Sequence, residues 1–184
     1  MKLRMAMLAM MLAGMAAGCA HGGPVVVTDP DAPRSLPEQG PVSVRWGDPA
    51  GFSELRHSGS SWAAARGDWV RQIAEHVRDA AARRLGPGER LDVEITDIER
   101  AGDFEPWRTR GDDIRVVRDI YPPRISLRFR RYDAGGAVVA EGERDLADAA
   151  FMIQGSIGGR SDPLRYEKRL IDDWLREEFP RPGN

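Results

Sequence analysis

Apolar and polar residues alternate in several stretches of the chain, a pattern typical of β-strands with one buried face. The alternation is clearest in residues 42–46, 91–96 and 125–130. Residues 137–143 follow an Asp-Ala-Gly-Gly turn and are expected to return as the partner strand of a hairpin. The run 114–120, which ends before two prolines, predicts one more strand. We therefore expect a sheet of about four to five strands.

A second pattern, apolar residues three and four positions apart, predicts two amphipathic helices. The firm part of the first helix covers residues 68–85, and the pair Gly67-Asp68 can separate it from a start capped by Ser61. The second helix opens at Asp162 and Pro163. Its apolar stripe contains Tyr166, Leu170, Ile171, Trp174 and Leu175.

The order of these elements predicts the fold class. A sheet with one apolar face must bury that face, and two amphipathic helices are enough to cover it. We therefore expect a two-layer α+β fold, with a largely antiparallel sheet and both helices packed on one face. Residues 42–180 form this single globular domain, while the stretches 47–61 and 99–113 are expected to be loops.

The beginning of the chain has the features of a secretory signal peptide. Lys2 and Arg4 precede a 13-residue apolar run, residues 5–17, which is too short to cross a bilayer as a helix. The small residues before Cys19 resemble the bacterial lipobox, which implies cleavage after residue 18 and acylation of Cys19 with chains such as palmitate. Ala20 then implies sorting to the outer membrane. The alternative is an ordinary secreted protein with Cys19 near the cleavage point by chance.

Composition narrows the function further. Residues 19–41 are rich in Pro and Gly, so we expect a flexible tether between the lipid and the domain. Cys19 is the only cysteine, which excludes a disulfide within the chain and catalysis by a second thiol. Without residues 1–18, 25 basic and 29 acidic side chains remain, a net charge of −4. This balance does not favour nucleic acid as a partner.

The chain lacks the motifs of common catalytic sites. No serine lies in a nucleophile elbow, and the histidines at 21, 57 and 76 are not spaced as metal ligands, so we expect no cofactor and no metal. Two acidic alternatives stay open. Asp97, Glu99, Asp103 and Glu105 could hold a cation in an otherwise solvated loop, and Asp97 could act with Asp145 or Asp148 as an acid–base pair.

Two loops invite a binding hypothesis. Residues 155–161 are rich in glycine before a helix and could bind an anion, although a loop without a ligand is the simpler interpretation. Trp107 stands beside Arg108 and Arg110 in a polar segment, and Trp and Arg are enriched at the energetic centres of interfaces. We predict that these three residues contact a partner; the alternative is that Trp107 folds back over the core.

Four groups of residues occur in a characteristic order: 91–98 with Ala101-Gly102, Pro123-Arg124-Ile125, Asp145-Leu146 with Asp148, and Tyr166-Glu167-Lys168 with Trp174. Together they resemble domain-of-unknown-function family 3016, an uncharacterised family of bacterial secreted proteins. The chain departs from the family pattern at Glu99-Arg100 and at Tyr121-Pro122-Pro123. The family has no assigned activity, so the resemblance implies a location and a fold but no reaction.

These observations favour a non-enzymatic protein that binds a partner or assists assembly in the envelope. We expect it at the outer membrane, facing the periplasm, attached through Cys19 and contacting another envelope protein. One alternative is a carrier of a lipid or small apolar ligand, which needs a cavity between sheet and helices. The other is the carboxylate-dependent enzyme, which needs Asp97, Asp145 and Asp148 in one cleft.

Overall fold

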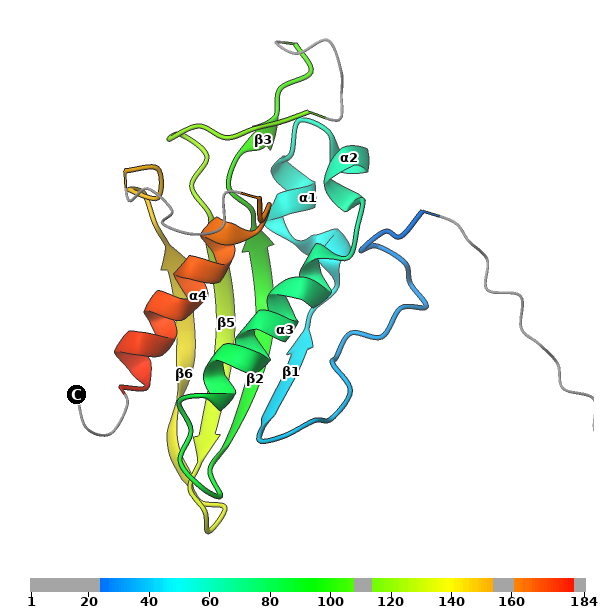
Figure 1. Ribbon diagram of the computed structural model, residues 1–184. Coiled ribbons are helices and arrows are strands. Elements are labelled where there is room, and N and C mark those ends of the chain that lie inside the picture. Colours follow the sequence, from blue (N-terminus) through cyan, green and yellow to red (C-terminus); the bar gives the residue numbers. More distant parts are fainter. Residues whose placement is uncertain (1–23, 108–113, 154–160, 181–184) are drawn as a thin grey trace, which may run out of the picture.

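The computed structural model describes residues 24–107, 114–153 and 161–180. Its main sheet has four strands in the order β1-β2-β5-β6, in which β1 and β2 are parallel and the other neighbours antiparallel. The strands are β1 (Val42–Trp46), β2 (Arg90–Glu99), β5 (Arg124–Tyr132) and β6 (Val138–Ala147). Figure 1 shows the sheet from its helical side. Four predicted strands therefore form one largely antiparallel sheet.

Two long helices cover one face of this sheet, as predicted (Figure 1). Helix α3 (Trp69–Ala82) connects β1 to β2, and α4 (Arg165–Glu178) follows the last strand. Both helices bury their apolar stripes against the inward residues of the strands. The aromatic ring of Phe129 on β5, for example, meets Trp174 of α4 edge-on with 5.9 Å between ring centroids. The predicted α+β class is confirmed.

The stretch between β1 and α3 contains two short helical segments where a loop was expected, the 3-10 turn η1 (Pro49–Gly51) and α1 (Ser53–His57). A third short helix, α2 (Ser61–Ala65), lies where the separate start of the first helix was predicted. The expected break at Gly67 is present, since α2 ends before it and α3 begins after it. Ser60, rather than Ser61, caps α2 by accepting a hydrogen bond from the Ala63 N–H.

The expected strand at 114–120 is much shorter than predicted. Only β4 (Arg115–Val116) forms, and it pairs with β3 (Asp103–Phe104) in a separate two-stranded ribbon. The predicted loop 99–113 is also not fully exposed, because Ala101, Phe104 and Glu105 are buried. Gly102 explains the tight return: its φ is +80°, and a Cβ there would lie 2.7 Å from the Val116 carbonyl oxygen.

The predicted tether 19–41 is corrected over its described part. Val27 N–H donates to the Ala65 carbonyl (2.9 Å), and Gly67 N–H donates to the Val25 carbonyl (2.8 Å). Further on, Leu36 is buried and its N–H donates to the Val44 carbonyl of β1 (2.9 Å). A proline-rich segment can lie extended along the edge of a strand, and the burial of its apolar side chains stabilises this position. From Val25 onward this segment is therefore fastened to the domain.

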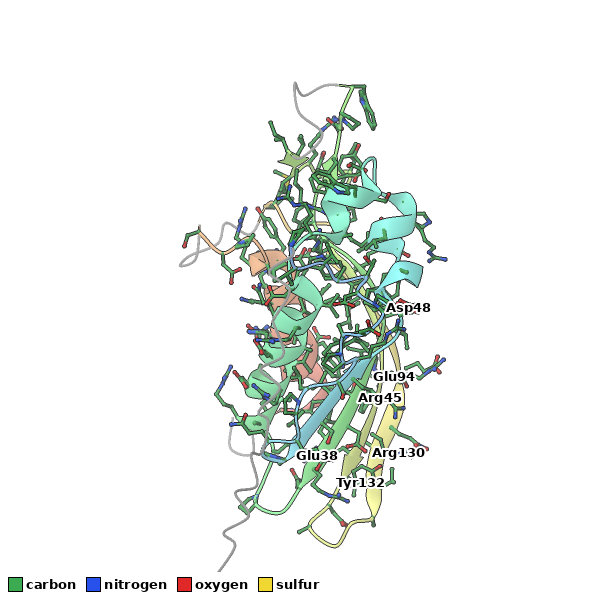
Figure 2. All side chains as sticks on the ribbon, turned by 90° about the vertical axis from the view of Figure 1, so that its right-hand side faces the viewer. Glu38, Arg45, Asp48, Glu94, Arg130 and Tyr132 are labelled. Carbon is green, nitrogen blue, oxygen red and sulfur yellow. The ribbon has the colours of Figure 1, made fainter. Side chains whose placement is uncertain are left out.

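The face of the sheet away from the helices carries charged residues in register. Arg45 pairs with Glu94, and Arg128 with Glu143, at N–O distances of 2.9 and 2.7 Å. In the next row Arg130 pairs with Glu141 at 2.9 Å. We call these residues the charge ladder; Figure 2 shows part of it beside Tyr132. An open hollow of about 520 Å³, lined largely by charged and polar residues, runs along part of it.

Candidate functional site

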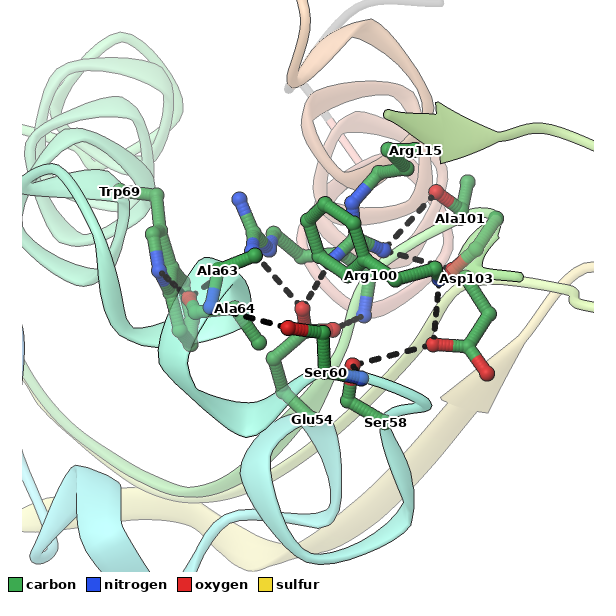
Figure 3. A network of polar contacts seen from close by, with 12 residues as sticks. Glu54, Ser58, Ser60, Ala63, Ala64, Trp69, Arg100, Ala101, Asp103 and Arg115 are labelled. Carbon is green, nitrogen blue, oxygen red and sulfur yellow. Dashed lines mark hydrogen bonds and ion pairs between the residues drawn. The ribbon is translucent and has the colours of Figure 1, made fainter. Parts of the chain in front are cut away.

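A cluster of buried charges joins the β3–β4 ribbon to the domain (Figure 3). Glu54 in α1 is only 4% exposed and accepts from the Arg100 backbone N–H and guanidinium, both at 2.8 Å. Its Oε1 also forms an ion pair with Arg115 of β4. One buried carboxylate thus holds two arginines, one at the end of β2 and one on the ribbon. We call Glu54, Arg100, Arg115 and Glu167 the buried ion cluster.

A bulge in β2 explains how α1 reaches this place. The pairing of β2 with β5 shifts between Ile95 and Asp97, which turns Asp97 toward the start of α1. Asp97 then accepts from the Ser53 backbone N–H at 2.6 Å and from its hydroxyl at 2.5 Å. A carboxylate at a helix N-terminus satisfies donors that have no partner within the helix. Asp97 therefore caps α1 and sets the position of Glu54.

The two arginines of the cluster are enclosed by backbone and aromatic groups. Arg115 donates to the Gly102 carbonyl at 2.6 Å and lies 4.7 Å over the Phe104 ring. Arg100 donates to the Ala64 carbonyl at 3.1 Å and lies 4.4 Å over the ring of Trp69. Burial lowers the pKa of Arg100, and the charge of Glu54 opposes this effect. The cluster therefore connects α1, α2, α3 and the ribbon.

Glu167 is the second buried carboxylate of this region. It belongs to the first turn of α4, is 1% exposed, and accepts from the Ala101 N–H at 2.6 Å through Oε1. Its Oε2 has no hydrogen-bond partner among the described residues. Burial raises the pKa of Glu167, and the hydrogen bond from Ala101 opposes the rise. Burial at this position therefore favours the protonated, uncharged form of the Glu167 carboxyl.

Close packing also holds the turn between α1 and α2 against the ribbon. A Cβ on Gly59 would lie 2.0 Å from the Phe104 carbonyl oxygen, so no larger residue fits. Asp103 accepts from the Ser58 hydroxyl at 3.1 Å and from the Gly59 N–H at 3.2 Å. The ribbon is thereby fixed on both sides, by the turn and by the buried ion cluster.

The acidic residues of the cation alternative each bind a different neighbour. Asp97 caps α1, Glu99 lies 3.7 Å from Arg124, and Asp103 binds the Ser58–Gly59 turn. Buried Glu105 accepts from the Tyr121 hydroxyl at 2.8 Å and pairs with Arg118 at 3.0 Å. Within the described ranges no three acidic, histidine or cysteine side chains could hold a metal ion.

Trp107 follows the ribbon and points into solvent. It is 69% exposed, so its ring does not fold back over the core. Arg108 and Arg110, the other predicted contact residues, lie outside the described residues, as does Cys19. Ile114 and Ile120 belong to the same end of the molecule and are 52% and 59% exposed. The partner contact of Trp107 stays a prediction.

The three carboxylates of the enzyme alternative are only partly brought together. Asp97 and Asp145 line one open hollow of about 440 Å³ with His57. Ser126 donates to Asp145 at 2.6 Å, while Asp148 pairs with Arg169 of α4 at 2.8 Å. Of the two candidate carboxylates in this hollow, Asp97 therefore already caps α1 and Asp145 is hydrogen-bonded to a serine.

Of the remaining candidate residues, His76 has a structural role. His76 of α3 binds Asp172 of α4, with 2.9 Å between Nε2 and Oδ1, which joins the two helices. His21 and most of the glycine-rich segment 155–161 lie outside the described residues.

The sequence does not predict the buried ion cluster, because charged residues are ordinarily expected to lie in water. One signal was present for Glu167. It precedes Leu170, Ile171 and Trp174 by three, four and seven residues, so helical periodicity places it on the apolar stripe of α4. No comparable pattern marks Glu54, whose partners Arg100 and Arg115 are 46 and 61 residues away.

Comparison with known proteins identifies the family. Residues 40–177 match the family described as "Protein of unknown function (DUF3016)". The chain belongs to this family. Two segments that carry the resemblance, Ala101-Gly102 and Tyr166-Glu167-Lys168, meet at the Ala101–Glu167 hydrogen bond of the buried ion cluster. The matched family region therefore contains all four residues of this cluster.

One solved structure is similar to this chain at low sequence identity. A crystal structure called a "putative lipoprotein from Caulobacter crescentus CB15" is 20% identical, with 68% of this chain and 87% of that chain covered and a TM-score of 0.32. No function of this chain follows from a likeness of that degree. No curated protein matches the sequence. Within the described ranges, no helix combines the length and the apolar character needed to cross a membrane.

Proposed function

We propose that this protein is a lipid-anchored, non-enzymatic envelope protein whose ribbon end binds a partner protein. The observation that carries the proposal is Trp107, a large aromatic residue left 69% exposed directly after a ribbon held by buried ion pairs. Exposed tryptophans on fixed supports are favourable contact residues because they bury a large area with little loss of conformational entropy.

The rigid support is central to this proposal. Binding costs less when the contact residue is already held in place, since less conformational freedom is lost. Glu54 fixes the ribbon from α1, and the Gly59 turn fixes it from the other side. Ile114 and Ile120 add exposed apolar area at the same end of the molecule, of the kind that marks interaction surfaces.

The anchor is the second part of the proposal. We infer that Cys19 is acylated after removal of residues 1–18 and that Ala20 directs the protein to the outer membrane, where the domain faces the periplasm. Cys19→Ala should leave the protein uncleaved or release it in soluble form. Membrane fractionation checks this, and an unchanged distribution between membrane and soluble fractions would contradict the anchor.

The carrier alternative has no observation in its favour. The space between sheet and helices is occupied by buried side chains, with Ile73, Ile95, Leu127 and Ile171 at most 1% exposed. The two hollows described above are open and lined by charged and polar groups as well as apolar ones. The enzyme alternative is likewise weakened by the separate positions of Asp97 and Asp148.

In-cell photo-crosslinking tests the partner contact. A photoreactive amino acid replaces Trp107 in one variant and Val139 in a control variant, because Val139 is 53% exposed on β6. We expect an envelope protein, identified by mass spectrometry, to crosslink at position 107 and not at position 139. The same product at both positions, or none above the unirradiated sample, would contradict the proposed function.

A further inference from the structure

The described chain begins beside α2, which limits how far the domain can lie from a lipid on Cys19. The hydrogen bonds of Val25 and Val27 to Gly67 and Ala65 fasten this strand-like segment along the exit of α2. Only residues 20–23 separate Cys19 from Pro24. Five fully extended residues span at most about 18 Å, so the entry point of the chain stays close to the lipid.

The surface at this entry point is apolar and aromatic. Trp62 of α2 and Val25 are each 65% exposed, and the Arg66 guanidinium lies 4.9 Å from the centre of the Trp62 ring. The opposite side of α2 is buried, where Ala63 and Ala64 pack with Phe104. We call Val25, Trp62 and Arg66 the anchor patch. The short helix thus turns its one large aromatic ring outward where the chain leaves toward Cys19.

We propose that the anchor patch lies on the membrane surface that receives the Cys19 lipid. This inference rests on the proposed acylation of Cys19 and adds an orientation to it. Tryptophan rings favour the interface between headgroups and hydrocarbon, because one part of the ring system is apolar and its N–H is polar. Arginine can bury its aliphatic stem there while its guanidinium binds lipid phosphate.

The short stretch of chain between Cys19 and Pro24 strengthens this orientation. The headgroup region is only about 5–7 Å thick on each side of the bilayer, so a reach of about 18 Å leaves the domain against the surface. Figure 1 shows the described chain entering beside α2, and the ribbon that precedes Trp107 packs through Phe104 on the opposite, buried side of α2. The membrane therefore receives the α2 side, and Trp107 remains available to a protein partner.

Fluorescence quenching by brominated lipids tests the orientation. The chain from residue 19 is coupled through its only thiol to maleimide-phosphatidylethanolamine in vesicles of phosphatidylethanolamine, phosphatidylglycerol and brominated phosphatidylcholine. Trp107→Phe retains Trp62, and the matched control Trp62→Phe retains Trp107. Both variants keep Trp46, Trp69 and Trp174, which are buried, so their contributions cancel in the comparison.

We expect quenching in Trp107→Phe to exceed that in Trp62→Phe by about twofold or more, because interfacial tryptophans lie within reach of the bromine atoms. Equal quenching, or stronger quenching of Trp107, would overturn the proposed orientation. The chemical coupling supplies the lipid, so this result does not depend on natural acylation, which the Cys19→Ala fractionation tests separately.

A spacer variant adds a second measurement. Inserting about 20 Gly and Ser residues between positions 23 and 24 gives the domain a long flexible link. Quenching of Trp62 should then fall toward that of Trp107. If quenching stays at the level of the short-tether protein, the short tether does not set the orientation and the inference fails.

Discussion

Arginine–carboxylate pairs occur in two settings in this protein, and the contrast between them explains where stability depends on charge. The charge ladder lies in water: in its Arg128–Glu143 pair the side chains are 57% and 74% exposed. In the buried ion cluster the side chain of Glu54 is 3% exposed, and the side chains of Arg100 and Arg115 are mostly covered. Water weakens the attraction between the charges of the ladder. In the buried ion cluster, hydrogen bonds to the other members and to nearby backbone groups replace the hydration of each charge.

The two settings differ in what the loss of one partner leaves behind. An exposed arginine that loses its carboxylate is hydrated again at little cost. A buried arginine that loses its carboxylate stays in a site that water enters poorly, so the penalty is large. The same pair of residue types is therefore almost neutral on the open sheet face and structurally essential under the ribbon.

The largest effect is expected for Glu54→Gln, which leaves Arg100 and Arg115 without their shared charge. Breaking a buried ion pair by removing one partner costs about 3–5 kcal/mol of unfolding free energy. Urea denaturation followed by circular dichroism measures this loss. A decrease below about 1 kcal/mol would place the buried ion cluster in the same class as the charge ladder.

The contribution of buried Glu167 to the unfolding free energy should depend on pH. Its pKa is raised above the usual value of 4.5, mainly by burial, so its contribution to stability is fully present below pH 4.5 and is lost as the pH rises through the raised value. Each unit of such a rise corresponds to about 1.4 kcal/mol. The unfolding free energy of the natural protein relative to Glu167→Gln should therefore fall as the pH is increased from 4.5. A constant difference across this range would be inconsistent with a raised pKa.

Glu89 should behave in the opposite way. Hydrogen bonds from Arg131 at 2.7 and 2.8 Å, and from the Gly86 N–H at 2.7 Å, lower its pKa below 4.5. Its stabilising contribution is therefore present above pH 4.5 and is lost as the pH falls through the lowered value. We expect Glu89→Gln to cost about 1 kcal/mol at neutral pH. Denaturant titrations in acid should show that this cost disappears.

The smallest effect is expected on the open face of the sheet. Glu143→Gln removes one member of the charge ladder and should change the unfolding free energy by less than about 0.5 kcal/mol. High salt should reduce even this difference, since it screens exposed charges. A loss comparable to that of Glu54→Gln would remove the distinction between the two settings.

The same contrast separates what the sequence predicted from what it did not. Strands and long helices were predictable because alternation and helical spacing are local, and β2, β5, α3 and α4 occur where these patterns lie. The buried ion cluster depends on residues far apart in the chain, such as Glu54 and Arg115, so no local pattern reports it. The tether was predicted too long because prolines and glycines suggested free chain, whereas Leu36 is buried beside β1.

The position of β1 has a consequence for the order of assembly. Its neighbour in the sheet is β2, and the register joins Val42 to Leu91 across the whole of α3. By contrast, β5 and β6 are joined by a short turn and can pair as soon as both exist. During synthesis from the amino end, about 50 residues separate the paired positions of β1 and β2, so β1 must wait for them before its neighbour in the main sheet is available. The first strand of the sheet to be synthesised thus cannot pair with β2 until α3 has been synthesised as well.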